Sequence, residues 1–121
     1  MTRVVFFREE DGTAPLLEWL DGLPQKAQDK CTERIERLRD LGHQLRRPEA
    51  DYLRDGIYEL RVKMERIQYR MLYFFHGQEA VVLSHGVVKQ QAAVAPREIQ
   101  RAIHRKRMFQ TDPKRYALEV L

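Results

Sequence analysis

Two arginines that a short hairpin would set face to face are the strongest candidates for chemistry in this 121-residue chain. Residues 57–64 and 67–75 are strand-like runs, separated only by Glu65 and Arg66. If those two residues form the turn, the strands are antiparallel and Arg61 lies directly opposite Arg70. A guanidinium group is always charged and can hold two phosphate oxygens at once. The pair therefore predicts an anion site, with phosphate as the first candidate.

Strand alternation places Lys63 and Gln68 on the same face as the two arginines. Like charges directly opposed destabilise a hairpin by up to about 1 kcal/mol. An anion between them would remove that cost. Another explanation is a carboxylate that balances the charge without any ligand, either Glu59, diagonal to Arg70, or Glu65, near Lys63.

His85 is the acid/base candidate, because imidazole titrates closest to neutral pH. Nearby cations should lower its pKa and favour the neutral form, which can accept a proton. The alternative is a strand-end histidine bonded to a backbone carbonyl. Gly86 stands next to it within a strand run, which indicates a bulge or a backbone that a ligand approaches closely. Lys89 would add positive charge beyond them.

The charge is unevenly distributed. Residues 1–60 hold 10 Lys/Arg and 13 Asp/Glu, whereas residues 61–110 hold 10 Lys/Arg and 3 Asp/Glu. Such a basic half is typical of a surface that binds an anion, although an arginine-rich solvated surface would look the same.

Several classes of protein are excluded. No apolar run approaches the roughly 20 residues that span a bilayer, and the first residues lack a signal-peptide cleavage site. Cys31 is the only cysteine, and it lies in the apolar stripe of a helix, so we expect a packed thiol. No His/Asp/Glu spacing resembles a metal site. We expect a soluble cytoplasmic protein without a metal or a small-molecule cofactor.

The positions of glycine and proline, together with the chain length, predict one domain, residues 1–121, with the element order β-α-α-β-β-β-α. The expected elements are a strand over 3–8, a helix from Pro15 to Leu20, a helix from Pro24 to about Leu41, a loop over 43–56, strands over 57–64, 67–75 and 80–88, and a helix from Pro96 to about Met108. This order predicts an α+β fold, an antiparallel sheet with the helices packed on one face. Tyr69 and Tyr73 would then pack in the core. On the arginine face, Leu72 or Phe74 could stack against a nucleobase of RNA.

Four segments together resemble the HigB-like, phage-derived branch of the RelE/ParE toxin superfamily. They are Tyr58-Glu59-Leu60-Arg61, Tyr69-Arg70-Met71-Leu72-Tyr73, Val81-Val82-Leu83-Ser84-His85-Gly86 with Lys89, and Pro96-Arg97-Glu98-Ile99-Gln100-Arg101-Ala102. The match in element order spans about residues 3–108. Gln90 replaces an expected lysine, a valine replaces an expected aromatic residue, and the tail after about residue 111 lies outside the family pattern.

The resemblance implies a RelE-like fold and a toxin of a type II toxin–antitoxin system, which cleaves messenger RNA on the ribosome without a metal and so inhibits translation. It also implies a helix-turn-helix antitoxin of the HigA type as partner. In such a reaction the RNA 2′-hydroxyl attacks the adjacent phosphate, and the protein moves protons and stabilises the phosphorane. The catalytic candidates are Arg61, Arg70, His85 and Lys89. The RNA-binding candidates are Lys63, Arg66, Gln68, Arg97 and Arg101.

Two other functions remain open. A ParE-like toxin would bind a protein target such as gyrase without cleaving RNA. A degenerate toxin would retain only antitoxin binding and act in operon regulation.

Overall fold

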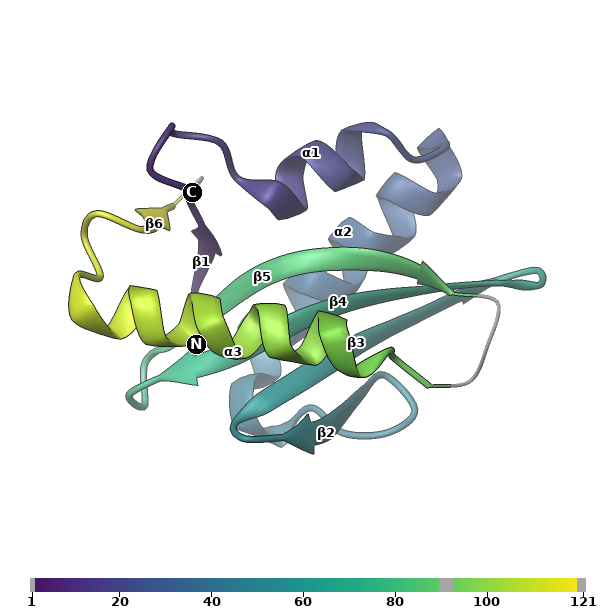
Figure 1. The fold of residues 1–121 in the computed structure, drawn as a ribbon. Coiled ribbons are helices and arrows are strands. Elements are labelled where there is room, and N and C mark those ends of the chain that lie inside the picture. The colour runs from purple at the N-terminus through teal and green to yellow at the C-terminus, as the bar shows by residue number, and fades with distance from the viewer. Residues whose placement is uncertain (1, 90–92, 120–121) are drawn as a thin grey trace.

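The computed structural model describes residues 2–89 and 93–119. Its elements are β1 (Arg3–Phe7), α1 (Pro15–Asp21), α2 (Gln25–Leu41), the 3-10 turn η1 (Gly42–Gln44), β2 (Ala50–Arg54), β3 (Ile57–Met64), β4 (Ile67–His76), β5 (Ala80–Lys89), α3 (Pro96–Thr111) and β6 (Ala117–Leu118). The α+β class and the order of the expected elements are confirmed (Figure 1). The last helix runs one turn further than expected.

The central hairpin has the register that its sequence predicts. β3 and β4 are antiparallel, with Arg61 opposite Arg70 and Lys63 opposite Gln68. Glu65 begins the turn with a positive φ of 58°. The two-residue connection fixes the register, because a slip of one residue would exchange the two faces of each strand.

The sheet is larger than the expected meander and is not wholly antiparallel. Its strand order is β2-β3-β4-β5-β1-β6. β1 pairs with β5 in parallel. The long connection between them, through α1, α2 and strands β2 to β4, allows this pairing. The expectation of a loop over residues 43–56 was wrong, because Ala50–Arg54 pairs with β3 as an edge strand. The tail returns as β6 along the other side of β1.

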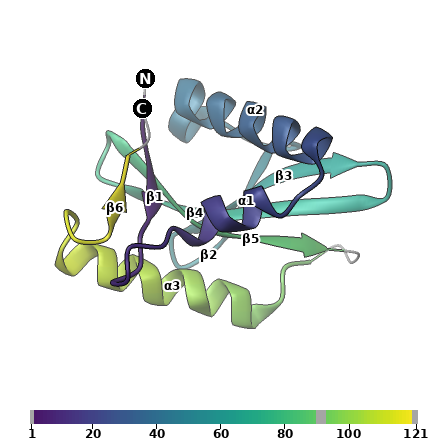
Figure 2. The same ribbon diagram turned by 90° about the horizontal axis from the view of Figure 1, so that it is seen from above.

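Helices cover both faces of this sheet. α1 and α2 pack on one face, as expected, over a core that includes Leu60, Met71 and Tyr73. α3 instead packs against strand residues of the opposite parity, among them Leu72 and Phe74. Figure 2 shows the strands between α2 and α3. Six consecutive β4 residues, 69–74, are buried because neither face of the strand is left to solvent.

Candidate phosphate-binding site

Three cross-strand rows on the α3 side of the sheet contain most of the candidate residues. From the hairpin turn inward they are Lys63–Gln68–Lys89, Arg61–Arg70–Val87 and Glu59–Leu72–His85. α3 covers Leu72 and His85 of the innermost row, since Leu72 belongs to its hydrophobic cluster and His85 contacts Glu98. Glu59, at the β3 end of that row, lies beside Arg70. The two outer rows lie nearer the hairpin turn, and their basic side chains form the candidate site.

A pocket of about 310 Å³ opens over the two outer rows. Its lining residues are Arg34, Pro48, Arg61, Lys63, Gln68 and Arg70. Four of these carry positive charge and none carries negative charge. A pocket of this composition suits a phosphate group with its flanking sugar, because several donors can reach the oxygens and no lining carboxylate repels them.

Arg70 forms the floor of this pocket and is almost completely buried. Its Nε lies 3.0 Å from Oε1 of Glu59, and its Nη2 donates a 2.5 Å hydrogen bond to Oε1 of Gln68. Burial lowers the pKa of Arg70, an effect that the Glu59 carboxylate opposes. The charge compensation by Glu59 that the sequence left open is therefore present.

Arg61 is the more accessible member of the arginine pair. Its side chain is 31% exposed, and its Nε lies 3.8 Å from Oε2 of Glu59. Glu59 thus stands close to both guanidinium groups. The two arginines share one pocket, but one carboxylate lies beside them, so the free protein does not display two bare cations.

Arg34, from α2, is a site residue that the sequence reasoning missed. Its guanidinium group donates a hydrogen bond to the backbone carbonyl of Arg61, and its Nε lies 3.4 Å from Glu49. It reaches the open edge of β3 next to the point where β2 stops pairing. Arg34 is 27 residues from Arg61 in sequence, and only the docking of α2 on the sheet brings them together, so no local pattern indicates the contact.

His85 does not line the pocket. It is buried under α3, where Nδ1 lies 2.8 Å from Oγ of Ser84 and Nε2 lies 3.1 Å from Oε1 of Glu98. Burial and Arg105 lower the pKa of His85 to about 4, so the ring is neutral at physiological pH. The expected lowering is present, but both ring nitrogens already have partners. The alternative expectation was a backbone carbonyl as partner, whereas the structure shows two side chains, Ser84 and Glu98.

The other RNA-binding candidates lie around the pocket or away from it. Arg66 is exposed in the hairpin turn, and Lys89 is half-buried beside Gln68. Arg97 and Arg101 are exposed on α3, and Arg101 donates a 3.1 Å hydrogen bond to Glu98. Gln90 lies outside the described residues.

The aromatic expectations are confirmed in one part and wrong in another. Tyr69 and Tyr73 pack in the core under α1 and α2. Leu72 and Phe74 do share the arginine face, but α3 buries them fully, so neither can act as a stacking platform.

Gly86 serves packing instead of ligand approach. A Cβ at this position would overlap the indole ring of Trp19 from α1. The bulge that the sequence suggested lies nearby, where the β4–β5 register shifts between Leu72 and Tyr73. Ser84 occupies the extra position on β5, and the shift places His85 on the α3 face.

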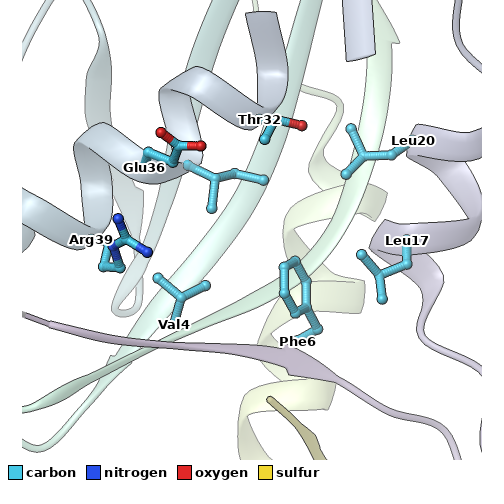
Figure 3. A pocket seen from close by; sticks show the side chains of 8 residues that line it. Val4, Phe6, Leu17, Leu20, Thr32, Glu36 and Arg39 are labelled. Carbon is cyan, nitrogen blue, oxygen red and sulfur yellow. The ribbon is translucent and has the colours of Figure 1, made fainter. Parts of the chain in front are cut away.

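A second hollow lies on the other face of the sheet, between α1, α2 and β1. It measures about 250 Å³ and is lined mainly by aliphatic and aromatic side chains. Figure 3 shows Leu17 and Leu20 of α1 facing Val4 and Phe6 of β1, with Glu36 and Arg39 of α2 at its other side. Its lining lacks the convergent cations that phosphate requires, so the nucleic-acid candidate remains the pocket beside β3.

Within the described part of the chain, no helix is long and apolar enough to cross a bilayer. Over the same residues, no three His, Cys, Asp or Glu side chains come together as a metal site would need.

The fold and the pocket define a small α+β domain with a cation-lined site on its sheet. The family model described as "Phage derived protein Gp49-like (DUF891)" matches residues 18–107. The protein therefore belongs to this Gp49-like family, a RelE-like family associated with toxin–antitoxin systems. No curated protein matches the chain significantly. The expected kinship with phage-derived, RelE-like proteins is confirmed, whereas the assignment to HigB stays a prediction.

Proposed function

We propose that this protein is the HigB-like toxin of a type II toxin–antitoxin system and cleaves messenger RNA on the ribosome. One observation carries the proposal: Arg61 and Arg70 are opposite each other on adjacent strands and line one pocket with Arg34 and Lys63. Four convergent cations at a pocket of about 310 Å³ fit the charge that develops on a phosphorane.

The proposed reaction is the metal-free route in which the RNA 2′-oxygen attacks the adjacent phosphorus. Arg61 and Arg70 stabilise the phosphorane, and Lys63 with Lys89 guides the strand over the outer row. Arg66 and Gln68 contact the transcript near the hairpin turn, while Arg97 and Arg101 contact RNA backbone along α3. His85 has no direct part in this scheme, since α3 covers it.

We further propose that a helix-turn-helix antitoxin of the HigA type holds the toxin silent in the cytoplasm. A short reading frame for such a protein, immediately beside this one, would support the assignment.

Primer extension on messenger RNA after brief induction tests the proposal. Discrete new 5′ ends within coding sequence are expected from the wild-type protein. The double variant Arg61→Ala/Lys63→Ala should lose them while remaining folded, because Arg61 is only half-buried and Lys63 is exposed. DNA breaks without RNA cleavage would point to a gyrase poison. Growth without any cleavage would point to a degenerate toxin.

A further inference from the structure

No carboxylate or imidazole is found among the residues that line the pocket. Arginine, lysine, glutamine and proline line it, and the sequence candidate His85 lies under α3 with both ring nitrogens occupied. Attack by a 2′-oxygen needs an acceptor for its proton. A carboxylate close behind the lining could accept this proton, because it carries the negative charge that the lining cations lack.

Among the described residues, Glu59 is a carboxylate that lies within 4 Å of both arginines of the pair. Its two oxygens lie 3.0 Å from Nε of Arg70 and 3.8 Å from Nε of Arg61. Within the described residues, the buried Oε1 has no hydrogen-bond partner of good geometry, and neither has Nε of Arg70. A buried carboxylate oxygen with an unused lone pair, beside the groups that would hold a phosphate, is a suitable proton acceptor.

The surroundings of Glu59 also change the pKa of its carboxyl group. Burial raises the pKa of Glu59, and Arg70 and Arg61 oppose that rise. The carboxylate therefore keeps the charged form available while becoming a stronger base than an exposed glutamate. A general base works best when its pKa approaches the operating pH.

We propose that Glu59 is the general base of the cleavage reaction and removes the 2′-hydroxyl proton while Arg61 and Arg70 hold the phosphate. This inference rests on the nuclease function proposed above. The 2′-oxygen then forms a bond to phosphorus, and the bond from phosphorus to the 5′-oxygen breaks. The products are a 2′,3′-cyclic phosphate and a 5′-hydroxyl, whose proton comes from solvent water. The proton on Glu59 returns to solvent, so charge and atoms balance.

The test compares Glu59→Gln with wild type in cleavage of messenger RNA on purified ribosomes. We expect Glu59→Gln to cleave at least 100-fold more slowly, yet to bind RNA blocked by 2′-O-methylation at least as tightly, because a repelling charge is gone. Glu65→Gln, in the exposed hairpin turn, is the matched control and should retain its rate. If Glu59→Gln cleaves within threefold of wild type, the inference is overturned.

A pH profile keeps the inference testable should Glu59→Gln fail to fold. The wild-type rate should fall on the acid side as Glu59 becomes protonated, and Glu59→Asp should move that limb to lower pH, since aspartate is the stronger acid. An acid limb that stays unmoved in Glu59→Asp contradicts the role of Glu59. Absence of any cleavage by the wild-type protein would instead refute the nuclease function itself.

Discussion

Nε of Arg70 lies 3.0 Å from Oε1 of Glu59, and the two side chains are 2% and 7% exposed. Because both side chains are buried, each charge depends on the other for its compensation. Removing one partner of such a pair leaves an uncompensated buried charge, whereas replacing both can be nearly neutral.

The first prediction concerns stability at this pair. Arg70→Ala should lower the free energy of unfolding by about 3–5 kcal/mol, because Glu59 would remain buried without its partner. The double variant Arg70→Met/Glu59→Leu should recover most of that loss. Urea denaturation followed by circular dichroism measures both. Arg61→Ala, at a half-exposed position, is the control and should cost less than about 1 kcal/mol.

From the sequence alone, Arg70→Ala looks like a clean test of activity. The burial of Arg70 changes that expectation, because loss of toxicity in this variant could follow from unfolding. An Arg70→Ala protein as stable as wild type would show that Glu59 is solvated without its partner.

The second prediction concerns Gly86. Gly86→Ala should destabilise the fold by about 1–3 kcal/mol, since the added methyl overlaps the Trp19 ring. Trp19 is held in place by edge-on packing against Tyr69, with the two ring centroids 6.2 Å apart. Thermal unfolding measures the loss. Gly22→Ala is the control: its Cβ would make only ordinary contacts, the nearest at 3.6 Å. Trp19→Leu in the Gly86→Ala background should restore part of the stability, and no restoration would mean that Trp19 is not the source of the clash.

The third prediction concerns pH and His85. Burial lowers the pKa of His85 to about 4, whereas the unfolded chain has a value near 6.5. Below about pH 6.5 the unfolded state therefore binds a proton that the folded state refuses, and folding loses stability as the pH falls toward 4. Protonation of His85 in the unfolded chain should lower the free energy of unfolding by about 2 kcal/mol between pH 7.5 and pH 5.

Urea titrations at the two pH values check this dependence on wild type and on His85→Gln. The variant lacks the titrating ring, so its stability should change less between them. An equal change in both proteins would assign the pH dependence to carboxylates instead.

The extent to which sequence foretold this structure depended on how local each signal is. The register of β3 and β4 follows from strand alternation and a two-residue turn, so Arg61 opposite Arg70 was predictable. The edge strand Ala50–Arg54 was not, because its short polar sequence resembles a loop until β3 pairs with it. The apolar run over residues 71–75 did contain a usable signal, since a strand that is apolar on both faces needs a cover on both.

The environment of the site depended on contacts that are distant in sequence. From the sequence, His85 resembled a catalytic histidine. The residues around it on β5 do not reveal that α3 places Glu98 within hydrogen-bond distance of its ring. Glu59 was visible as a counter-charge, but its burial follows from packing between strands and cannot be read from the alternation alone. Sequence therefore located the cationic face, while tertiary packing decided which of its residues face the pocket.

The fourth prediction separates two arginines on α2 that both contact Glu49. Arg34 lines the pocket, whereas Arg37, nearly one turn further along α2, is not among the lining residues. Nη2 of Arg37 lies 2.7 Å from Oε1 of Glu49. Arg34→Ala should weaken binding of a short single-stranded RNA roughly tenfold, because one charged contact to phosphate is lost. It should also reduce the slope of log affinity against log salt by about 0.7. Fluorescence anisotropy at several salt concentrations measures both, with Arg37→Ala as the matched control. Equal losses of affinity in the two variants would mean that both arginines support RNA binding only by stabilising the contact between α2 and Glu49. Arg34 would then make no direct contact with RNA.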